Sequence, residues 1–308
     1  MRHRARSLAA ALTAAAVLVL AVAAGAAPAA AGEVGLVDGL WVMKKVDERY
    51  EGDDVQEDLL LTLEKTSFKE KSPQVLSVRW LRKDRGRNDS LLVYFVGPLY
   101  AQGVTLNMEI KPYLDDERFL YLPKPNLIRR IHAKDQHTNF MGTDFSYYDL
   151  SEREPDEENH KLLRIEEHGG VLCYVVETTP KEATPDGYSK KLFWVDKDRF
   201  TKVRIQYFNR AGKLWKQYDP QDWREIQGIW TPLRLVMNDL LRLHRTTIER
   251  TNVRYNQKPD DTLFLPQNLD GVRYQGGTFA LLPPAQRPKH APPQPSEGPI
   301  EEPRPGEP

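Results

Sequence analysis

Short, strand-like segments follow one another through most of this chain with no long helical pattern between them. The segments are rich in β-branched and aromatic residues, and turns such as Gly169-Gly170 and Pro185-Asp186-Gly187 separate them. Parallel strands need long crossover connections, usually helices, so this arrangement predicts one antiparallel meander. The predicted strands are Leu59–Lys65, Val75–Lys83, Ser90–Val96, Arg118–Leu122, Leu127–Ile131, Leu162–His168, Val171–Thr179, Lys190–Asp196, Lys202–Phe208, Leu214–Tyr218, Trp230–Asn238 and Thr246–Tyr255.

Alternation within many of these segments predicts a sheet with one apolar face. Leu76, Val78 and Trp80, for example, are separated by polar residues. A long sheet must cover such a face, and curling is the simplest way to do so. Apolar residues at helical spacing between Leu36 and Val46 predict a short helix as part of the cover. We expect a mostly β, α+β fold: a curled antiparallel sheet, forming an incomplete barrel, with helices covering its concave face.

The N-terminus carries the pattern of an export signal. Arg2, Arg4 and Arg6 precede the apolar run Leu8–Ala24, and small-residue cleavage sites follow up to Ala31. This pattern predicts a secretory signal peptide over residues 1–31 and a periplasmic mature protein. The alternative is a retained N-terminal membrane anchor, because the run continued to Ala31 is long enough to span a bilayer.

The remaining chain is expected to form one domain over residues 32–272 and a tail over residues 273–308. The tail is rich in proline and poor in apolar residues, which predicts disorder. Lysine and arginine number 44, as do aspartate and glutamate. Loss of residues 1–31 removes three arginines and leaves 41 basic against 44 acidic residues, a balance that does not favour binding to nucleic acid. The single cysteine, Cys173, lies in an apolar strand and is interpreted as a packing residue.

The segment Phe119–Leu150, FLYLPKPNLIRRIHAKDQHTNFMGTDFSYYDL, combines a double arginine with a dense apolar cluster around Gly142. The residues after Gly142 predict a short aromatic helix with Thr143 or Asp144 as its N-cap. Such a helix is not stable alone in water, so we expect it to insert into the concave face of the sheet. It is either a permanent part of the core or a lid whose displacement opens a cavity.

The same segment resembles the LolA-like family of outer-membrane lipoprotein-sorting proteins, as do two later blocks in the same order. These blocks are YSKKLFWVDKDRFTKVRIQYFNRAGKLWKQY and IQGIWTPLRLVMND, and the resemblance spans about residues 59–269. Phe200-Thr201 stands where the family commonly has proline, and Phe208-Asn209 stands where Tyr-Asp is common. The resemblance implies a LolA/LolB-like incomplete barrel with an apolar cavity for lipid. It also implies that Arg129 or Arg130 pairs with the lid.

Our first hypothesis is a periplasmic carrier or sorting protein that binds a lipid or a lipoprotein acyl chain without catalysis. We expect a monomer without cofactor that contacts envelope proteins. The predicted lid residues are Phe140, Met141 and Phe145, and the predicted cavity residues are Val78, Trp80, Val93, Phe95, Tyr121, Val175, Trp194, Ile205 and Met237. The alternative is a secreted structural or protein-interaction module with a filled core and a Pro-rich tail that binds a partner.

Enzyme chemistry finds little support in the sequence. His132 and His137 flank AKDQ, a spacing that matches no zinc motif, and no G-x-S-x-G elbow is present. The acidic run Glu152–Glu158 is typical of a solvated loop. We therefore predict no metal site. Paired catalytic acids stay open, because only the fold could bring them together, so an envelope hydrolase is a third and more distant hypothesis.

Overall fold

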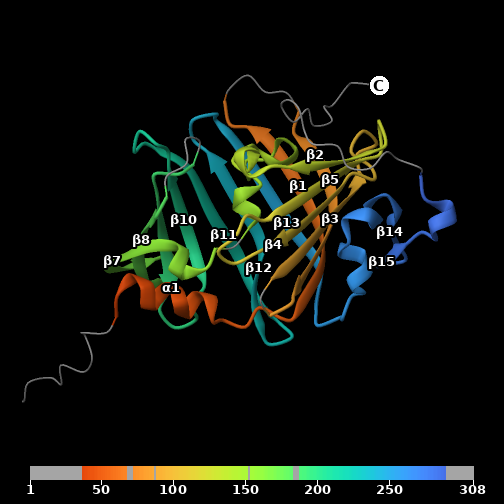
Figure 1. Ribbon diagram of the computed structural model, residues 1–308. Helices are drawn as coiled ribbons and strands as arrows, with labels where there is room; N and C mark the ends of the chain where they lie inside the picture. The colour runs from red at the N-terminus through yellow and green to blue at the C-terminus, as the bar shows by residue number, and fades with distance from the viewer. Residues whose placement is uncertain (1–36, 68–71, 87, 152, 183–186, 289–308) are drawn as a thin grey trace, which may run out of the picture. The chain divides into compact units, whose positions relative to one another are not determined.

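The computed structural model describes residues 37–67, 72–86, 88–151, 153–182 and 187–288 (Figure 1). The predicted signal peptide and residues 289–308 of the predicted tail lie outside these ranges. Within them, no helix has the length and apolar character needed to cross a membrane.

Thirteen strands form one antiparallel sheet, as the sequence predicted, in the order β6-β5-β4-β3-β2-β1-β13-β12-β11-β10-β9-β8-β7. The prediction missed β4. It also began β1 several residues too late and ended β11 several residues too early. The strands are β1 (Asp54–Lys65), β2 (Gln74–Asp84), β3 (Asp89–Gly97), β4 (Thr105–Ile110), β5 (Glu117–Leu122), β6 (Leu127–Ile131), β7 (Glu158–His168), β8 (Val171–Pro180), β9 (Lys190–Asp196), β10 (Lys202–Phe208), β11 (Leu214–Ile226), β12 (Ile229–Asp239) and β13 (His244–Tyr255).

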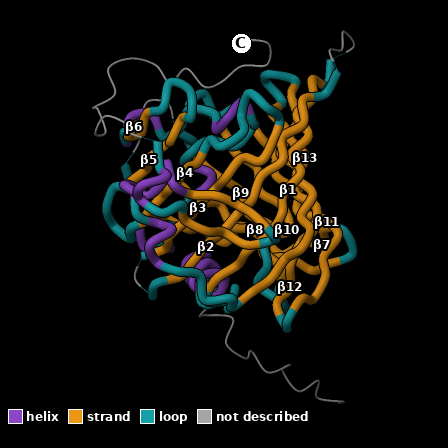
Figure 2. Tube along the Cα trace, turned by 90° about the vertical axis from the view of Figure 1, so that its right-hand side faces the viewer, coloured by secondary structure: helices purple, strands orange, loops and turns teal. Residues whose placement is uncertain are grey.

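Two meanders meet at the centre of this sheet. Strands β1 and β13 pair from Val55↔Tyr255 to Lys65↔His244, with one shift of register between Gln56 and Asp58. The sheet curls without closing into a barrel, so β6 and β7 are its two edges (Figure 2). Residues 132–157, which connect β6 to β7, must therefore run from one edge to the other. We call these residues the covering segment.

Helix α1 (Gly39–Asp47) covers part of the concave face, as predicted. Asp38 is its N-cap and accepts a hydrogen bond from the backbone nitrogen of Trp41 at 2.7 Å. Val42, Met43 and Val46 are buried in the main apolar core. Gly39 lies against the backbone of β7, where an added Cβ would come within 2.6 Å of two backbone atoms.

The described residues of the covering segment form no α-helix, so the prediction of an aromatic helix after Gly142 was wrong. It forms short 3-10 turns instead: η1 (Ala133–Asp135), η2 (Phe140–Gly142), η3 (Tyr148–Leu150) and η4 (Pro155–Glu157). Thr143 Oγ1 donates back to the carbonyl oxygen of Phe140 at 2.7 Å, and Asn139 pairs with Ser146 in an isolated bridge. The polar side chains expected to cap a helix therefore stabilise a tight loop.

The opposite face of β2–β6 is covered by the end of the described chain. Turns η5 (Asp261–Phe264) and η6 (Pro266–Gly271) bring Leu263, Phe264 and Leu269 onto Leu81 and Leu92. A hairpin of β14 (Val272–Gln275) and β15 (Thr278–Leu281) follows, and then turn η7 (Pro284–Gln286). The prediction of a disordered tail beginning at residue 273 was therefore wrong for residues 273–281. Within this hairpin the rings of Tyr274 and Phe279 pack against each other.

Candidate functional site

A cavity of about 740 Å³ lies on the concave side of the sheet, beside the covering segment. Strands from both meanders, the end of α1 and several residues of the covering segment, from Phe145 to Ser151 and from Arg153 to Pro155, contribute to its wall. Its apolar lining includes Leu59, Trp80, Leu91, Phe145, Phe193, Ile205, Tyr207, Tyr218, Leu235 and Ile248. Those of them that lie on strands alternate with residues on the other face of the sheet, so they point to the concave side.

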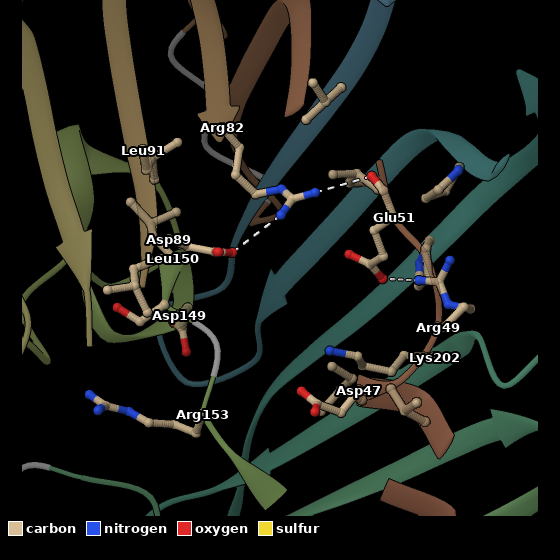
Figure 3. A pocket seen from close by; sticks show the side chains of 18 of the residues that line it. Asp47, Arg49, Glu51, Arg82, Asp89, Leu91, Asp149, Leu150, Arg153 and Lys202 are labelled. Carbon is tan, nitrogen blue, oxygen red and sulfur yellow. Dashed lines mark hydrogen bonds and ion pairs between the residues drawn. The ribbon is translucent and has the colours of Figure 1, made fainter. Parts of the chain in front are cut away.

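Charged side chains line another part of the same cavity (Figure 3). Arg82 Nη1 lies 3.2 Å from Asp89 Oδ2, and Arg82 Nη2 donates to the carbonyl oxygens of Glu51 and Gly52 at 3.1 and 3.0 Å. Glu51 also pairs with Arg49. These contacts attach the loop between α1 and β1 to the end of β2. The cavity thus has an apolar part and a charged margin, and the largely buried ion pairs Arg250–Glu57 and Lys191–Glu158 also belong to its lining.

The covering segment is attached to β13 through Asp144. This carboxylate is fully buried and accepts hydrogen bonds from Thr246 Oγ1 at 2.7 Å and from His244 Nδ1 at 2.8 Å. The backbone nitrogen of Asp144 in turn donates to Thr246 Oγ1 at 2.9 Å. Arg242 is a more distant partner, 3.8 Å from the carboxylate.

A second attachment joins Asp149 to β11. Lys216 Nζ lies 3.2 Å from Asp149 Oδ2, and both side chains are almost completely buried. Tyr188 Oη and the backbone nitrogen of Ser146 donate to the same carboxylate at 2.9 and 2.8 Å. Burial raises the pKa of Asp149, but Lys216 and the hydrogen bonds from Ser146 more than offset this effect, so the pKa is lowered.

A third attachment holds the end of the covering segment to the β4–β5 turn. Asp116 accepts from Ser151 Oγ at 2.8 Å and from Arg118 Nη2 at 2.5 Å, and Arg153 Nη2 lies 3.4 Å away. Arg118 is fully buried, and burial lowers its pKa. The covering segment is therefore fixed to both meanders by buried polar contacts.

The predicted cavity residues fall into three groups. Trp80, Ile205 and the lid residue Phe145 line the cavity. Val78, Val93, Phe95 and Met237 lie on the same concave face but are fully buried in the main core, together with the lid residues Phe140 and Met141. The rings of Phe95 and Phe140 are 5.7 Å apart. The covering segment therefore fills one part of the interior and leaves the cavity in another.

Tyr121, Val175 and Trp194 do not belong to the concave face, and their assignment to the cavity was wrong. Tyr121 packs under the C-terminal turns, and Val175 and Trp194 form a separate cluster with Cys173. Their neighbours Leu120, Leu122, Tyr174, Val176, Phe193 and Val195 belong to the main core instead. Both faces of these strands are apolar because both are covered, so alternation does not reveal which face is concave.

The two candidate arginines lie on opposite faces of β6. Arg129 pairs in register with Leu120, a residue of the main core, whereas the guanidinium of Arg130 lies 6.0 Å from the ring centre of Phe119. The pairing of Arg129 with the lid stays a prediction. The residues that the sequence did not single out are Asp149, Lys216, Thr246 and Tyr188. Of these four, only Lys216 could have been noticed in the sequence, as a lysine within a predicted strand.

Two other titratable side chains, Cys173 and His137, are held in packed surroundings. Cys173 is buried, and burial raises the pKa of its thiol to about 11, which suits a packing residue. His137 packs against the ring of Tyr148, with centres 4.7 Å apart. Among the described residues, no group of three or more histidine, cysteine, aspartate and glutamate side chains could hold a metal ion.

Comparison with known proteins identifies solved structures that share this fold. A family model with the description "Uncharacterized protein" matches residues 87–271. A putative outer membrane lipoprotein-sorting protein domain from Vibrio parahaemolyticus is 22% identical, with a TM-score of 0.70, and the match covers 75% of this chain and 97% of that one. A DUF1329 family protein from Desulfovibrio piger is 24% identical over the same shares, also with a TM-score of 0.70. A LolA superfamily protein from Nitrosomonas europaea is 19% identical, with a TM-score of 0.57, over 74% of this chain and 98% of that one. No curated protein matches the chain.

Proposed function

Because the chain belongs to the family described as "Uncharacterized protein" and has a LolA-like, carrier-like fold, we propose that it is a periplasmic carrier for a lipid or a lipoprotein acyl chain. The ligand would occupy the cavity between the sheet and the covering segment, without being chemically changed. The observation that supports this proposal is the cavity itself, in an interior that the covering segment fills only in part.

The size of the cavity suits one long apolar chain. Its volume of about 740 Å³ lies within the range of typical small-molecule sites, about 300–1,000 Å³. Each methylene group moved from water into an apolar wall contributes about 0.8 kcal/mol. A dozen carbons would therefore gain roughly 10 kcal/mol before the costs of ordering are subtracted. Leu59, Ile205 and Leu235 are examples of the aliphatic surface that would receive them.

The charged margin gives the proposed ligand an orientation. Arg82, Glu51 and Asp89 lie where the α1–β1 loop meets β2 and β3, and Leu235 and Ile248 lie on the concave wall. An amphiphile would place its chain against the wall and its polar group at this margin, since an unpaired charge in the apolar part would be costly. The proposal includes export by a cleaved signal peptide, a monomeric state and transfer to or from an envelope protein.

A filled-core interaction module stays the second candidate, and one observation favours it. The part of the interior around Phe95, Phe140 and Tyr147 is fully packed, and three polar attachments hold the covering segment in place. If ligands never entered the remaining cavity, the fold would serve only as a scaffold. The two candidates therefore differ in whether the cavity takes up an acyl chain.

A binding titration separates these candidates. The purified protein is titrated with a fluorescent fatty acid whose emission increases in an apolar site, and unlabelled fatty acid is then used to displace it. Leu235→Trp, which adds volume to the cavity wall, should weaken binding by about tenfold or more. Leu172→Trp, at an exposed position on β8, is the matched control and should bind like the wild type. Equal binding by both variants, or none by the wild type, would reject the carrier proposal.

A further inference from the structure

A group of three exposed leucines lies at one end of the sheet. Leu240, Leu241 and Leu243 form the β12–β13 turn and are 43%, 40% and 53% exposed. The pairs Asp239↔His244 and Lys216↔Asp239 place this turn beside the β10–β11 turn, and Lys65↔His244 places it beside the end of β1. The neighbouring turns are in direct contact, because Thr66 donates to the carbonyl oxygen of Leu243 at 2.8 Å. In Figure 1 these turns lie along the top of the sheet.

Exposed cations surround these leucines. Arg242 lies within the turn, Arg210 and Lys213 lie in the β10–β11 turn, and Lys65 ends β1. All four are exposed, and the guanidinium of Arg242 lies 3.8 Å from the carboxylate of Asp144. In the described residues of these turns, 65–67, 209–213 and 240–243, there is no aspartate or glutamate. We call these three leucines and four cations the leucine end.

The opposite end of the sheet has the reverse character. Residues 47–53, 84–86 and 88–89, around the α1–β1 loop and the β2–β3 turn, carry Asp47, Glu48, Glu51, Asp53, Asp84 and Asp89 against Arg49 and Arg85. The cavity margin also belongs to this end. The two ends of one domain therefore differ in charge, and only the leucine end combines apolar tips with a local excess of positive charge.

We propose that the leucine end docks the protein onto the surface of an anionic lipid bilayer. The three leucines would enter the headgroup region, and the four cations would lie beside lipid phosphates. Apolar side chains combined with cations are the chemistry by which proteins bind such surfaces, and each nearby lysine or arginine contributes about a fivefold gain in binding. The acidic end would face away from the membrane, because like charges repel it.

Flotation with lipid vesicles tests this docking surface. The wild type should bind vesicles of equal parts phosphatidylglycerol and phosphatidylcholine, and high salt or vesicles of phosphatidylcholine alone should abolish binding. Arg210→Gln, Lys213→Gln and Arg242→Gln together should weaken binding by roughly a hundredfold. The matched control neutralises Arg224, Arg234 and Lys258, which are exposed outside the leucine end, and should bind like the wild type.

The apolar part is tested separately. Leu240→Ser, Leu241→Ser and Leu243→Ser together should abolish flotation, whereas Leu163→Ser with Leu172→Ser, at exposed positions on β7 and β8, should not. A spin label on Leu241→Cys reports whether the tip enters the bilayer, and the native Cys173 is too deeply buried to compete for the label. Equal losses in the control variants, or a wild type that floats only when membrane proteins are present, would overturn the proposal, and the latter would indicate a protein partner. The cavity titration does not depend on this result.

Discussion

Lys216 of β11 and Asp149 of the covering segment form an ion pair of 3.2 Å with both side chains buried, so a segment that leaves one edge of the sheet is fixed to the other meander. Tyr188 and Ser146 complete the hydrogen bonds of the carboxylate. This contact explains how a segment without an α-helix is held across the concave face. It also indicates that the cavity is left beside a fixed element.

Asp149→Asn should destabilise the fold by about 3–5 kcal/mol, because it leaves the buried ammonium of Lys216 without a counter-charge. Chemical denaturation measures this change. Glu177→Gln, which breaks the half-exposed pair of Glu177 with Lys190, is the control and should cost less than about 1 kcal/mol. Adding Lys216→Met to Asp149→Asn should recover part of the loss. A cost for Asp149→Asn no greater than that of the control would mean that the pair does not hold the covering segment.

Gly39→Ala should destabilise the protein by about 1–3 kcal/mol, because the new Cβ would lie 2.6 Å from the backbone of His160 and Lys161 and would move α1 away from β7. Thermal unfolding gives the difference. Gly97→Ala is the comparison, since a Cβ there meets no atom within 4 Å. Equal stability of the two variants would contradict the close packing of α1 on β7.

Stability should decrease as the pH falls from about 7 to about 5, and His160 should account for part of this decrease. Burial lowers the pKa of His160, whose ring nitrogens lie 2.8 Å from Thr178 Oγ1 and from the carbonyl oxygen of Pro155. Below the ordinary histidine pKa of about 6.5, the unfolded chain takes up a proton that the folded chain resists, so acid favours unfolding. Denaturation curves across this range should be flatter for His160→Gln. An unchanged pH dependence would show that another group is responsible.

Hydrogen exchange should show that the covering segment is as well protected as the central strands. The amide of Phe140 donates to the carbonyl oxygen of Phe145 at 2.7 Å, and that of Asp144 donates to Thr246 Oγ1 at 2.9 Å. Exchange of these amides requires the attachments to break. The loop between α1 and β1 should exchange faster and become protected when fatty acid is added. Fast exchange at residues 140 and 144 would instead indicate a lid that opens.

Much of the fold follows from local sequence patterns. Strand residues such as Val203, Ile205 and Tyr207 alternate with polar neighbours, and short turns leave no room for crossover helices, so the antiparallel meander could be predicted. The missed strand β4, Thr105–Ile110, contains Asn107, whose side chain donates to the carbonyl oxygen of Phe264. That contact joins residues far apart in the sequence, and a local pattern cannot indicate it.

The site was harder to predict than the fold. Val175 and Trp194 are as apolar as Val176 and Phe193, and only the curvature of the sheet decides which of them face the interior. Asp144 could be recognised as a polar residue of the covering segment, but its partners His244 and Thr246 are a hundred residues away. The resemblance to LolA-like proteins indicated the curled sheet, and it did not indicate these attachments.

Native mass spectrometry of the protein purified from a bacterial envelope tests the carrier proposal most directly. The wild type should carry a co-purified species with the mass of a lipid or a lipidated peptide. That species should be absent from Leu235→Trp and retained by Leu172→Trp, since only the former position lines the cavity. A wild type that is free of lipid under conditions that preserve non-covalent complexes, or a lipid that Leu235→Trp retains in full, would contradict the account.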